Sequence, residues 1–177
     1  MEDITEEVRL TPAPEVVTGL INLIVTSPWP KGEGERGEYF QRLGFLAAES
    51  PADLPDSPSN AGGELLATGM GFTEGSWMSF RGGLLSIDLF LYKGLQGTRT
   101  LTVTGYHALQ SQLAGIYGAP LNESLASGEH PSSTWHIQDI SIELYSHLDR
   151  TPVVQLKASH IQRNASYKDF TTSLSQN

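Results

Sequence analysis

The pattern of hydrophobic and polar positions predicts helices in the first part of the chain. Residues Glu15–Thr26 place apolar side chains at helical spacing, which indicates a buried helix that ends before Ser27-Pro28-Trp29-Pro30. A glycine-rich acidic loop is expected at Lys31–Gly37, and a second short helix at Glu38–Leu46. Residues 47–63 carry the prolines, glycines and aspartates typical of a long surface loop.

From Glu64 onward the pattern changes to the alternation of β-strands, most clearly in Leu84–Tyr92, where one face is expected to be buried and the other partly wet. A helix is predicted at Thr104–Tyr117, followed by a polar loop at Asn122–Ser133, and residues 162–177 are expected to form a frayed polar tail. The segments predicted as strands are Glu64–Thr68, Ser76–Arg81, Leu84–Tyr92, Thr98–Val103, Thr134–Gln138, Ile140–Tyr145 and Val153–His160.

These elements predict an α+β fold made of a single domain over residues 1–177. The expected architecture is a mostly antiparallel, twisted sheet of about five to seven strands, with about two or three helices packed on one face. A chain of 177 residues is long enough to bury about two thirds of the surface that its unfolded form exposes.

The composition is that of a folded cytoplasmic protein. Hydrophobic residues make up 38% of the chain and charged residues 18%, and the absence of cysteine excludes disulfides and thiolate chemistry. The first residues are acidic, unlike a signal peptide, and the longest apolar run is far below the ~20 residues of a membrane span. We therefore expect a protein that does not associate with membranes.

The charge is distributed unevenly. Residues 1–80 hold thirteen Asp and Glu against four Lys and Arg, whereas residues 81–177 hold seven of each kind. The eleven basic residues are spread singly, which argues against nucleic acid as a partner. An acidic half favours a cationic partner and speeds its approach, unless it serves only to keep the protein in solution.

No pattern of residues indicates a catalytic, metal or cofactor site. His136, His147 and His160 lack the close spacing of zinc ligands and are better interpreted as solvated side chains on a polar sheet face. The sequence contains no Gly-x-Ser-x-Gly turn, and the glycine-rich segment 69–75 lacks the lysine of a phosphate-binding loop. Two carboxylates could still meet in space, but most acids lie in expected loops. We expect a protein that is not an enzyme.

The second half of the chain resembles a known family. A helix ending in Leu113-Ala114-Gly115-Ile116-Tyr117-Gly118-Ala119-Pro120 is followed by a strand that opens with Ser133-Thr134-Trp135, and then by the strands of Ile140–Leu144 and Val153–Leu156. This order, over residues 84–161, resembles actinobacterial immunity proteins of polymorphic toxins. It is similar to that of the immunity factor of the mycobacterial NAD-glycohydrolase necrotizing toxin.

The resemblance implies a cytosolic antitoxin that binds a cognate secreted toxin enzyme, an NAD-glycohydrolase among the candidates, and occludes its active site. A toxin that handles phosphates would offer a cationic cleft to the acidic half of this chain. A small-ligand or peptide-binding module without catalytic activity is the alternative. The oligomeric state stays open.

Two segments are the candidates for partner binding. Trp29 lies between prolines, where its ring either forms an exposed hot spot beside the acidic segment or tucks beneath the loop. The turn after Leu84–Tyr92 either inserts into the partner's cleft or is a plain hairpin end. The candidate residues are Trp29, Glu33, Glu35, Glu38, Lys93, Leu95 and Gln96.

Overall fold

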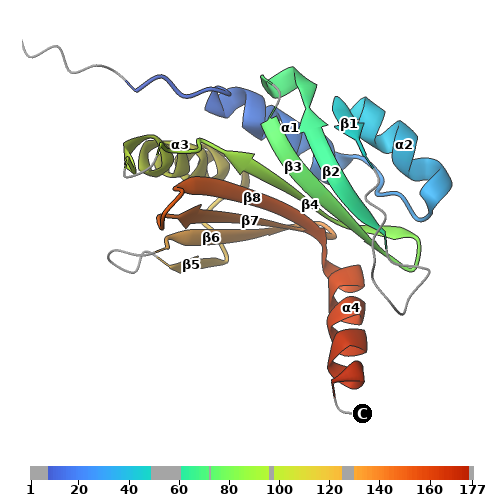
Figure 1. The fold of residues 1–177 in the computed structure, drawn as a ribbon. Helices are drawn as coiled ribbons and strands as arrows, with labels where there is room; N and C mark the ends of the chain where they lie inside the picture. Colours follow the sequence, from blue (N-terminus) through green and yellow to red (C-terminus); the bar gives the residue numbers. More distant parts are fainter. Residues whose placement is uncertain (1–7, 49–60, 72, 96–97, 125–129, 176–177) are drawn as a thin grey trace, which may run out of the picture.

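An eight-stranded antiparallel sheet runs through the molecule in the order β1-β2-β3-β4-β8-β7-β6-β5 (Figure 1). The structure is a computed structural model that describes residues 8–48, 61–71, 73–95, 98–124 and 130–175. The strands are β1 (Phe45–Ala47), β2 (Gly62–Ala67), β3 (Thr73–Phe80), β4 (Gly83–Leu91), β5 (Asn122–Ser124), β6 (Ser132–Ile137), β7 (Ile140–His147) and β8 (Val153–His160).

The sheet consists of two meanders that meet at one strand pair. Strands β1 to β4 follow one another along one half of the sheet, and β5 to β8 along the other half. The halves join where β4 pairs with β8, in a register that places Ile87 opposite Ala158 and Asp88 opposite Lys157. This pair is the centre of the sheet.

Three of the helices cover one face of the sheet. The helices are α1 (Pro14–Thr26), α2 (Glu33–Arg42), α3 (Thr100–Tyr117) and α4 (Ile161–Leu174), with a 3₁₀ turn at Thr68–Met70. Helices α1 and α3 pack against each other, and α3 also contacts β6, β7 and β8. Helix α2 contacts β1 and packs Phe40 on Trp77 of β3, with ring centroids 5.6 Å apart, so it covers the β1 to β3 part of the same face. Helix α4 extends away from the rest of the molecule (Figure 1).

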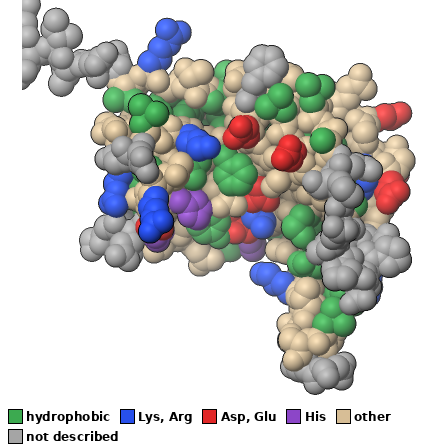
Figure 2. All heavy atoms as spheres, viewed as in Figure 1, with side chains coloured by type: hydrophobic (Ala, Val, Ile, Leu, Met, Phe, Trp, Pro, Cys, Tyr) green, Lys and Arg blue, Asp and Glu red, His purple; other side chains and the backbone are tan. Residues whose placement is uncertain are grey.

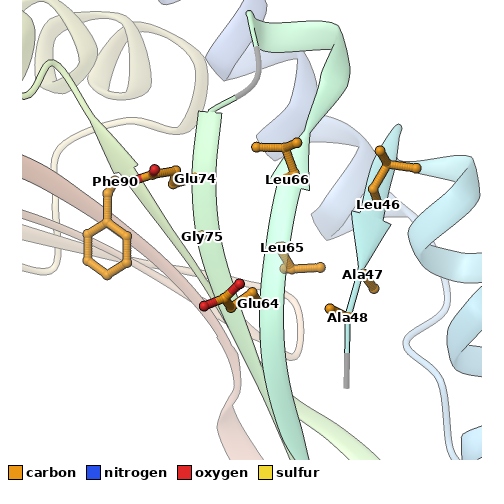
Figure 3. Close-up of a pocket in the computed structure, with 9 residues that line it drawn as sticks. All are labelled: Leu46, Ala47, Ala48, Glu64, Leu65, Leu66, Glu74, Gly75 and Phe90. Carbon is orange, nitrogen blue, oxygen red and sulfur yellow. The ribbon is translucent and has the colours of Figure 1, made fainter. Parts of the chain in front are cut away.

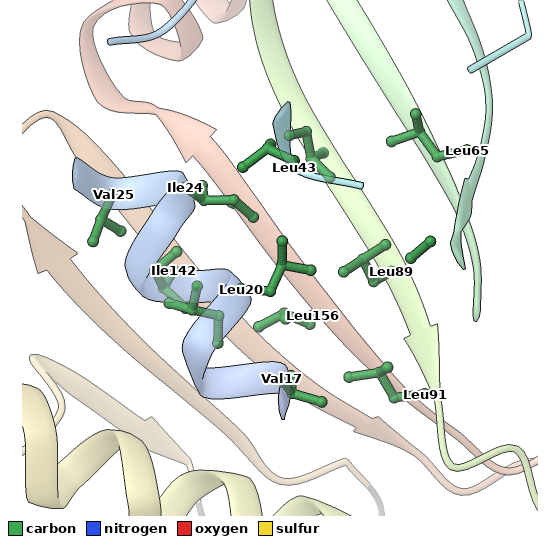
Figure 4. Packing of buried hydrophobic residues seen from close by; sticks show 14 of the residues in the cluster. Val17, Leu20, Ile24, Val25, Leu43, Leu65, Leu89, Leu91, Ile142 and Leu156 are labelled. Carbon is green, nitrogen blue, oxygen red and sulfur yellow. The ribbon is translucent and has the colours of Figure 1, made fainter. Parts of the chain in front are cut away.

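The core lies between α1, α3 and the sheet. Val17, Leu20 and Ile24 of α1 point toward the strands, where Leu89 and Leu156 meet them at the centre of the sheet (Figure 4). Each of these five side chains is buried. The helical spacing of α1 and the period of two in the strands bring the apolar faces together.

The predicted α+β class and antiparallel sheet are confirmed, but the counts of elements are wrong. The described residues form eight strands instead of five to seven, and four α-helices instead of two or three. β1 and β5 are edge strands of three residues each, too short for alternation to reveal them. β5 lies within the predicted loop Asn122–Ser133. Residues 49–60 of the predicted loop 47–63 lie outside the described residues, and its two ends belong to β1 and β2.

The predicted loop Lys31–Gly37 is largely helical, because α2 begins at Glu33. Glu33 and Glu35 lie in the first turn, where carboxylates stabilise a helix N-terminus. The carboxylate of Glu35 also accepts a hydrogen bond of 2.9 Å from the backbone N–H of Lys31. These interactions outweigh the low helix propensity of the glycines.

Two further segments are helical where the sequence predicted otherwise. The predicted strand Thr98–Val103 contains the start of α3 at Thr100, because its alternating Thr, Leu and Val side chains fit a helix packed on Tyr92 equally well. The predicted tail 162–177 is helical up to Leu174, and α4 has no buried residue. Its weak amphipathic pattern explains why the sequence did not reveal it.

Strand β4 is buried on both faces except at Phe90, which is exposed on the face away from the helices. Ser86 and Asp88 point away from the helices yet are 2% and 9% exposed, respectively. Ser86 lies between Met78 of β3 and Ser159 of β8, and Gln155 of β8 donates to the Asp88 carboxylate. Within the described part of the chain, no helix has the length and apolar character that crossing a membrane requires.

Candidate functional site

The face of the sheet opposite α1 and α3, called the open face here, carries polar side chains in rows that cross the strands. Because side chains alternate along a strand, the residues between the core positions all project to this side. Figure 2 shows acidic, basic and histidine side chains gathered over the strands on this face. The middle row contains Asp88 of β4, Lys157 of β8 and Glu143 of β7, which are cross-strand partners.

A chain of hydrogen bonds runs from β7 to β4. Gln155 Nε2 donates to Asp88 Oδ1 at 2.7 Å, and Gln155 Oε1 lies 2.8 Å from His147 Nε2. The amide therefore accepts from His147, whose Nε2 carries the hydrogen in this arrangement. An amide does not relay a proton as a carboxylate or imidazole does, so this chain orients side chains rather than activating a nucleophile.

Tyr145 and Glu143 form a second polar pair on the same face. The Tyr145 hydroxyl donates to Glu143 Oε2 at 2.6 Å, and the rings of Tyr145 and His147 stack with centroids 6.2 Å apart. Burial, together with the Glu143 carboxylate, raises the pKa of Tyr145 to about 12. The phenol is therefore a hydrogen-bond donor at neutral pH.

Asp88 is the buried member of this network. Burial raises the pKa of its carboxyl above the ordinary value, while Lys157 and the hydrogen bond from Gln155 act in the opposite direction. Glu143 raises this pKa further. The two partners on β8 thus offset only part of the cost of desolvating this carboxylate.

A cavity of about 520 Å³ lies on the open face beside this network. Glu64 of β2 and Glu74 of β3 line it together with Phe90 of β4, whose ring is 39% exposed (Figure 3). Leu46 and Leu66 add apolar surface on the side of β1. The cavity thus combines carboxylates with an aromatic ring and aliphatic side chains, a combination suited to a cationic group on an apolar stem.

Trp29 does not form an exposed hot spot. Its side chain is buried at 7% exposure, and its Nε1 donates to Ile24 O at 3.0 Å. The ring packs against Tyr39 and His160, each with a centroid separation of 6.2 Å. Of the two alternatives for this ring, the structure shows the tucked one.

The other predicted binding residues do not form one surface. Glu33, Glu35 and Glu38 are exposed on α2, which packs through Phe40 on the helix-covered face of the sheet. Lys93 and Leu95 are exposed after the end of β4, next to α3 (Figure 1). Gln96 lies outside the described residues. The acidic helix and this turn therefore occupy separate parts of the molecule.

Sequence reasoning missed the residues that the open face brings together. Asp88, Gln155 and Glu143 each occupy an alternate position of a predicted strand, which is the only local signal that they share. These residues are neighbours because β4 pairs with β8. The sequence alone does not reveal which distant strands pair.

The histidines lie apart from any metal-binding arrangement. His136 is exposed on β6, His147 bonds Gln155, and His160 packs on Trp29. Within the described ranges, no three His, Cys, Asp or Glu side chains are placed to hold a metal ion.

Comparison with known proteins assigns no family to this chain. No family model matches the chain, and no curated protein matches it. Among solved structures, a DUF4309 family protein, YjgB from Bacillus subtilis subsp. subtilis str. 168, is similar over 83% of this chain and 98% of its own length. The two share 18% sequence identity with a TM-score of 0.43, a likeness too low to support a conclusion about this chain.

Proposed function

We propose that this chain is an immunity protein, an antitoxin without catalytic activity that holds a cognate toxin enzyme against its open face and occludes the toxin's active site. The resemblance of residues 84–161 to actinobacterial immunity proteins suggests the class of partner, and an NAD-glycohydrolase is the candidate toxin. The observation that carries the proposal is the cavity in which Glu64 and Glu74 lie beside Phe90.

The cavity favours a partner with basic side chains. A lysine or arginine can lay its methylene stem along Leu66 while its charged head reaches Glu64 and Glu74. A guanidinium in this position could also stack on the exposed ring of Phe90. A toxin whose active site binds phosphates presents such basic side chains in its cleft.

The charges around the cavity support rapid association. Asp88 and Glu143 add carboxylates to the same face, with Lys157 between them. Glu33, Glu35 and Glu38 are exposed on α2, outside the open face. Charges outside a contact raise the association rate more than the affinity, so we assign the α2 carboxylates to steering and the cavity carboxylates to binding.

The experiment is co-expression of the full chain with the toxin domain encoded beside its gene. We expect rescue of growth, and a purified complex whose affinity falls as salt is raised. The double variant Glu64→Gln/Glu74→Gln should bind about tenfold more weakly or worse, equivalent to about 1.4 kcal/mol. The matched control Asp149→Asn/Asp169→Asn removes two exposed carboxylates elsewhere and should bind like the wild type.

Two results would contradict the proposal. If no complex forms and growth is not rescued, the chain is not the antitoxin of that toxin. If the complex forms but tolerates the double variant as well as the control, the toxin binds elsewhere than the cavity.

A small-ligand binding module is the second candidate, because the cavity volume of about 520 Å³ falls within the usual range for such sites. This alternative predicts thermal stabilisation by a cationic metabolite and no response to the toxin domain. The variant Phe90→Ala should abolish such stabilisation, whereas Leu95→Ala, which changes a side chain that is 82% exposed, should leave it intact.

A further inference from the structure

A second cleft, lined by basic residues, lies where α4 leaves the sheet. It has a volume of about 340 Å³. Among its described lining residues there is no carboxylate, although the chain as a whole carries a net charge of −9. The residues that line this cleft, called the α4 cleft here, are Lys31, Phe80, Arg81, Gly83, Arg163 and Ser166.

Arg163 is held in a fixed position at the cleft. Its Nη1 donates to Pro30 O at 2.6 Å and to Leu84 O at 2.8 Å, which ties α4 to two other segments. Gly83 makes room for the guanidinium, because a Cβ at that position would come within 3.2 Å of Nη1. A guanidinium has five N–H donors, so the N–H groups of Nε and Nη2 are left to serve the cleft.

Arg81 is also restrained. It lies over the ring of Phe80, with 4.9 Å between the guanidinium carbon and the ring centroid, and 5.9 Å from the ring of Phe170. Arg81, with a φ of +51°, and Gly82, with a φ of +81°, form the tight turn between β3 and β4. A position with positive φ favours glycine or asparagine, so the arginine at this position carries backbone strain.

Three basic side chains line the cleft, and no carboxylate is among the described residues that line it. Burial lowers the pKa of Arg163, and Glu35 of α2 acts in the opposite direction. The Glu35 carboxylate also accepts a hydrogen bond from the backbone N–H of Lys31, so this acidic side chain lies close to the cleft. An anion in the cleft would be attracted by all three cationic side chains that line it, those of Lys31, Arg81 and Arg163.

We propose that the α4 cleft binds a phosphate group, carried by a phosphomonoester or present as free phosphate. The fixed guanidinium of Arg163 is the primary donor, since its planar fork matches two phosphate oxygens. Arg81 and Lys31 supply the remaining charge for a dianion. The cleft is large enough for a phosphate that carries a small organic group, and the ring of Phe80 lines the cleft beside it.

The test uses the isotope-labelled full chain, followed by nuclear magnetic resonance at constant ionic strength. We expect inorganic phosphate to cause saturable shifts of the Gly83 amide and of the Arg163 side-chain N–H. Phenyl phosphate that binds more tightly than inorganic phosphate identifies an ester as the ligand, and equal binding identifies free phosphate. Shifts that rise linearly without saturation, or that benzoate reproduces equally, would overturn the proposal.

Two matched variants locate the site. Lys31→Gln/Arg81→Gln removes two exposed charges from the cleft and should weaken phosphate binding by about tenfold or more. Lys168→Gln removes an exposed charge from α4 outside the lining residues and should bind phosphate like the wild type. Unchanged binding by the double variant, with a spectrum that shows an intact fold, would place the phosphate elsewhere and reject the α4 cleft.

Discussion

The backbone of Gly105 in α3 lies directly against the aromatic ring of Tyr92, with no space between them for a side chain. Tyr92 follows β4, its hydroxyl donates to Pro12 O at 2.8 Å, and its carbonyl accepts from Thr102 Oγ1 at 2.9 Å. One buried tyrosine thus joins the centre of the sheet to α3 and to the segment before α1.

Replacing Gly105 with alanine should destabilise the protein, although alanine is the better helix former. The new methyl group would overlap the Tyr92 ring, and overpacking of this kind costs about 1–3 kcal/mol. Gly115→Ala, on the same helix with open space around it, should instead stabilise by about 0.5–1 kcal/mol. Urea unfolding of both variants checks the pair, and equal changes would show that α3 does not approach Tyr92 this closely.

Replacing Trp29 should affect stability rather than partner binding. Trp29→Phe removes the hydrogen bond to Ile24 O and part of the ring volume, so we expect a loss of about 1–3 kcal/mol. Leu95→Ala changes an exposed side chain and should stay within about 0.5 kcal/mol of the wild type. Chemical denaturation measures both effects. A Trp29→Phe variant with wild-type stability and weakened toxin binding would restore Trp29 as a contact residue.

The stability of the protein should depend on the charge of Asp88. Burial raises its pKa, so the folded protein holds this proton more tightly than the unfolded chain does. The contribution of this carboxyl is therefore fully present below its ordinary pKa of 3.8 and is lost as pH rises through the folded pKa.

The variant Asp88→Asn, which cannot ionise, should consequently be more stable than the wild type at neutral pH. The difference should shrink as pH falls, which urea unfolding from about pH 3 to about pH 8 will measure. Asp169→Asn, at an exposed position on α4, should show no such trend. A variant less stable than the wild type at neutral pH would mean that Lys157 and Gln155 outweigh the cost of burial.

A single substitution outside α4 should remove the contacts that hold the C-terminal part of this helix against the rest of the molecule. Phe80 contacts Tyr167 and Phe170, with ring centroids 5.3 Å and 5.5 Å away, and α4 itself has no buried residue. In Phe80→Ala we expect fast amide hydrogen exchange in α4 beyond Ser166 while the amides of the central strands stay protected, because Arg163 still bonds Pro30 O and Leu84 O. Leu174→Ala, which changes an exposed side chain, should leave exchange in α4 unchanged.

The fold was predictable where one face of an element is apolar. α1 has a continuous apolar stripe, and β8 was predicted with its observed bounds because Val154, Leu156 and Ala158 alternate with polar residues. α4 and the edge strand β5 carry no comparable pattern, since neither buries a residue. Contacts with other segments determine whether these elements form, and a local sequence pattern carries no information about such contacts.

The candidate site was far less predictable than the fold. Glu64 and Glu74 lie within the acidic half that the charge asymmetry singled out, yet the residues chosen from that half were those of α2 and Trp29. A binding cavity arises from the register between strands, here Glu64 opposite Ser76 and Leu66 opposite Glu74. Composition predicts the sign of the surface charge, whereas register decides which carboxylates share a cavity.

The junction of the two meanders at β4 and β8 also sets the order of events during synthesis. β4 ends at Leu91, whereas its partner β8 begins only at Val153, after α3 and three other strands have been made. Until β8 emerges from the ribosome, the growing chain presents β4 as an unpaired apolar edge open to aggregation. This distant pairing raises the contact order and slows folding, so we expect the emerging chain to need chaperones most before β8 closes the sheet.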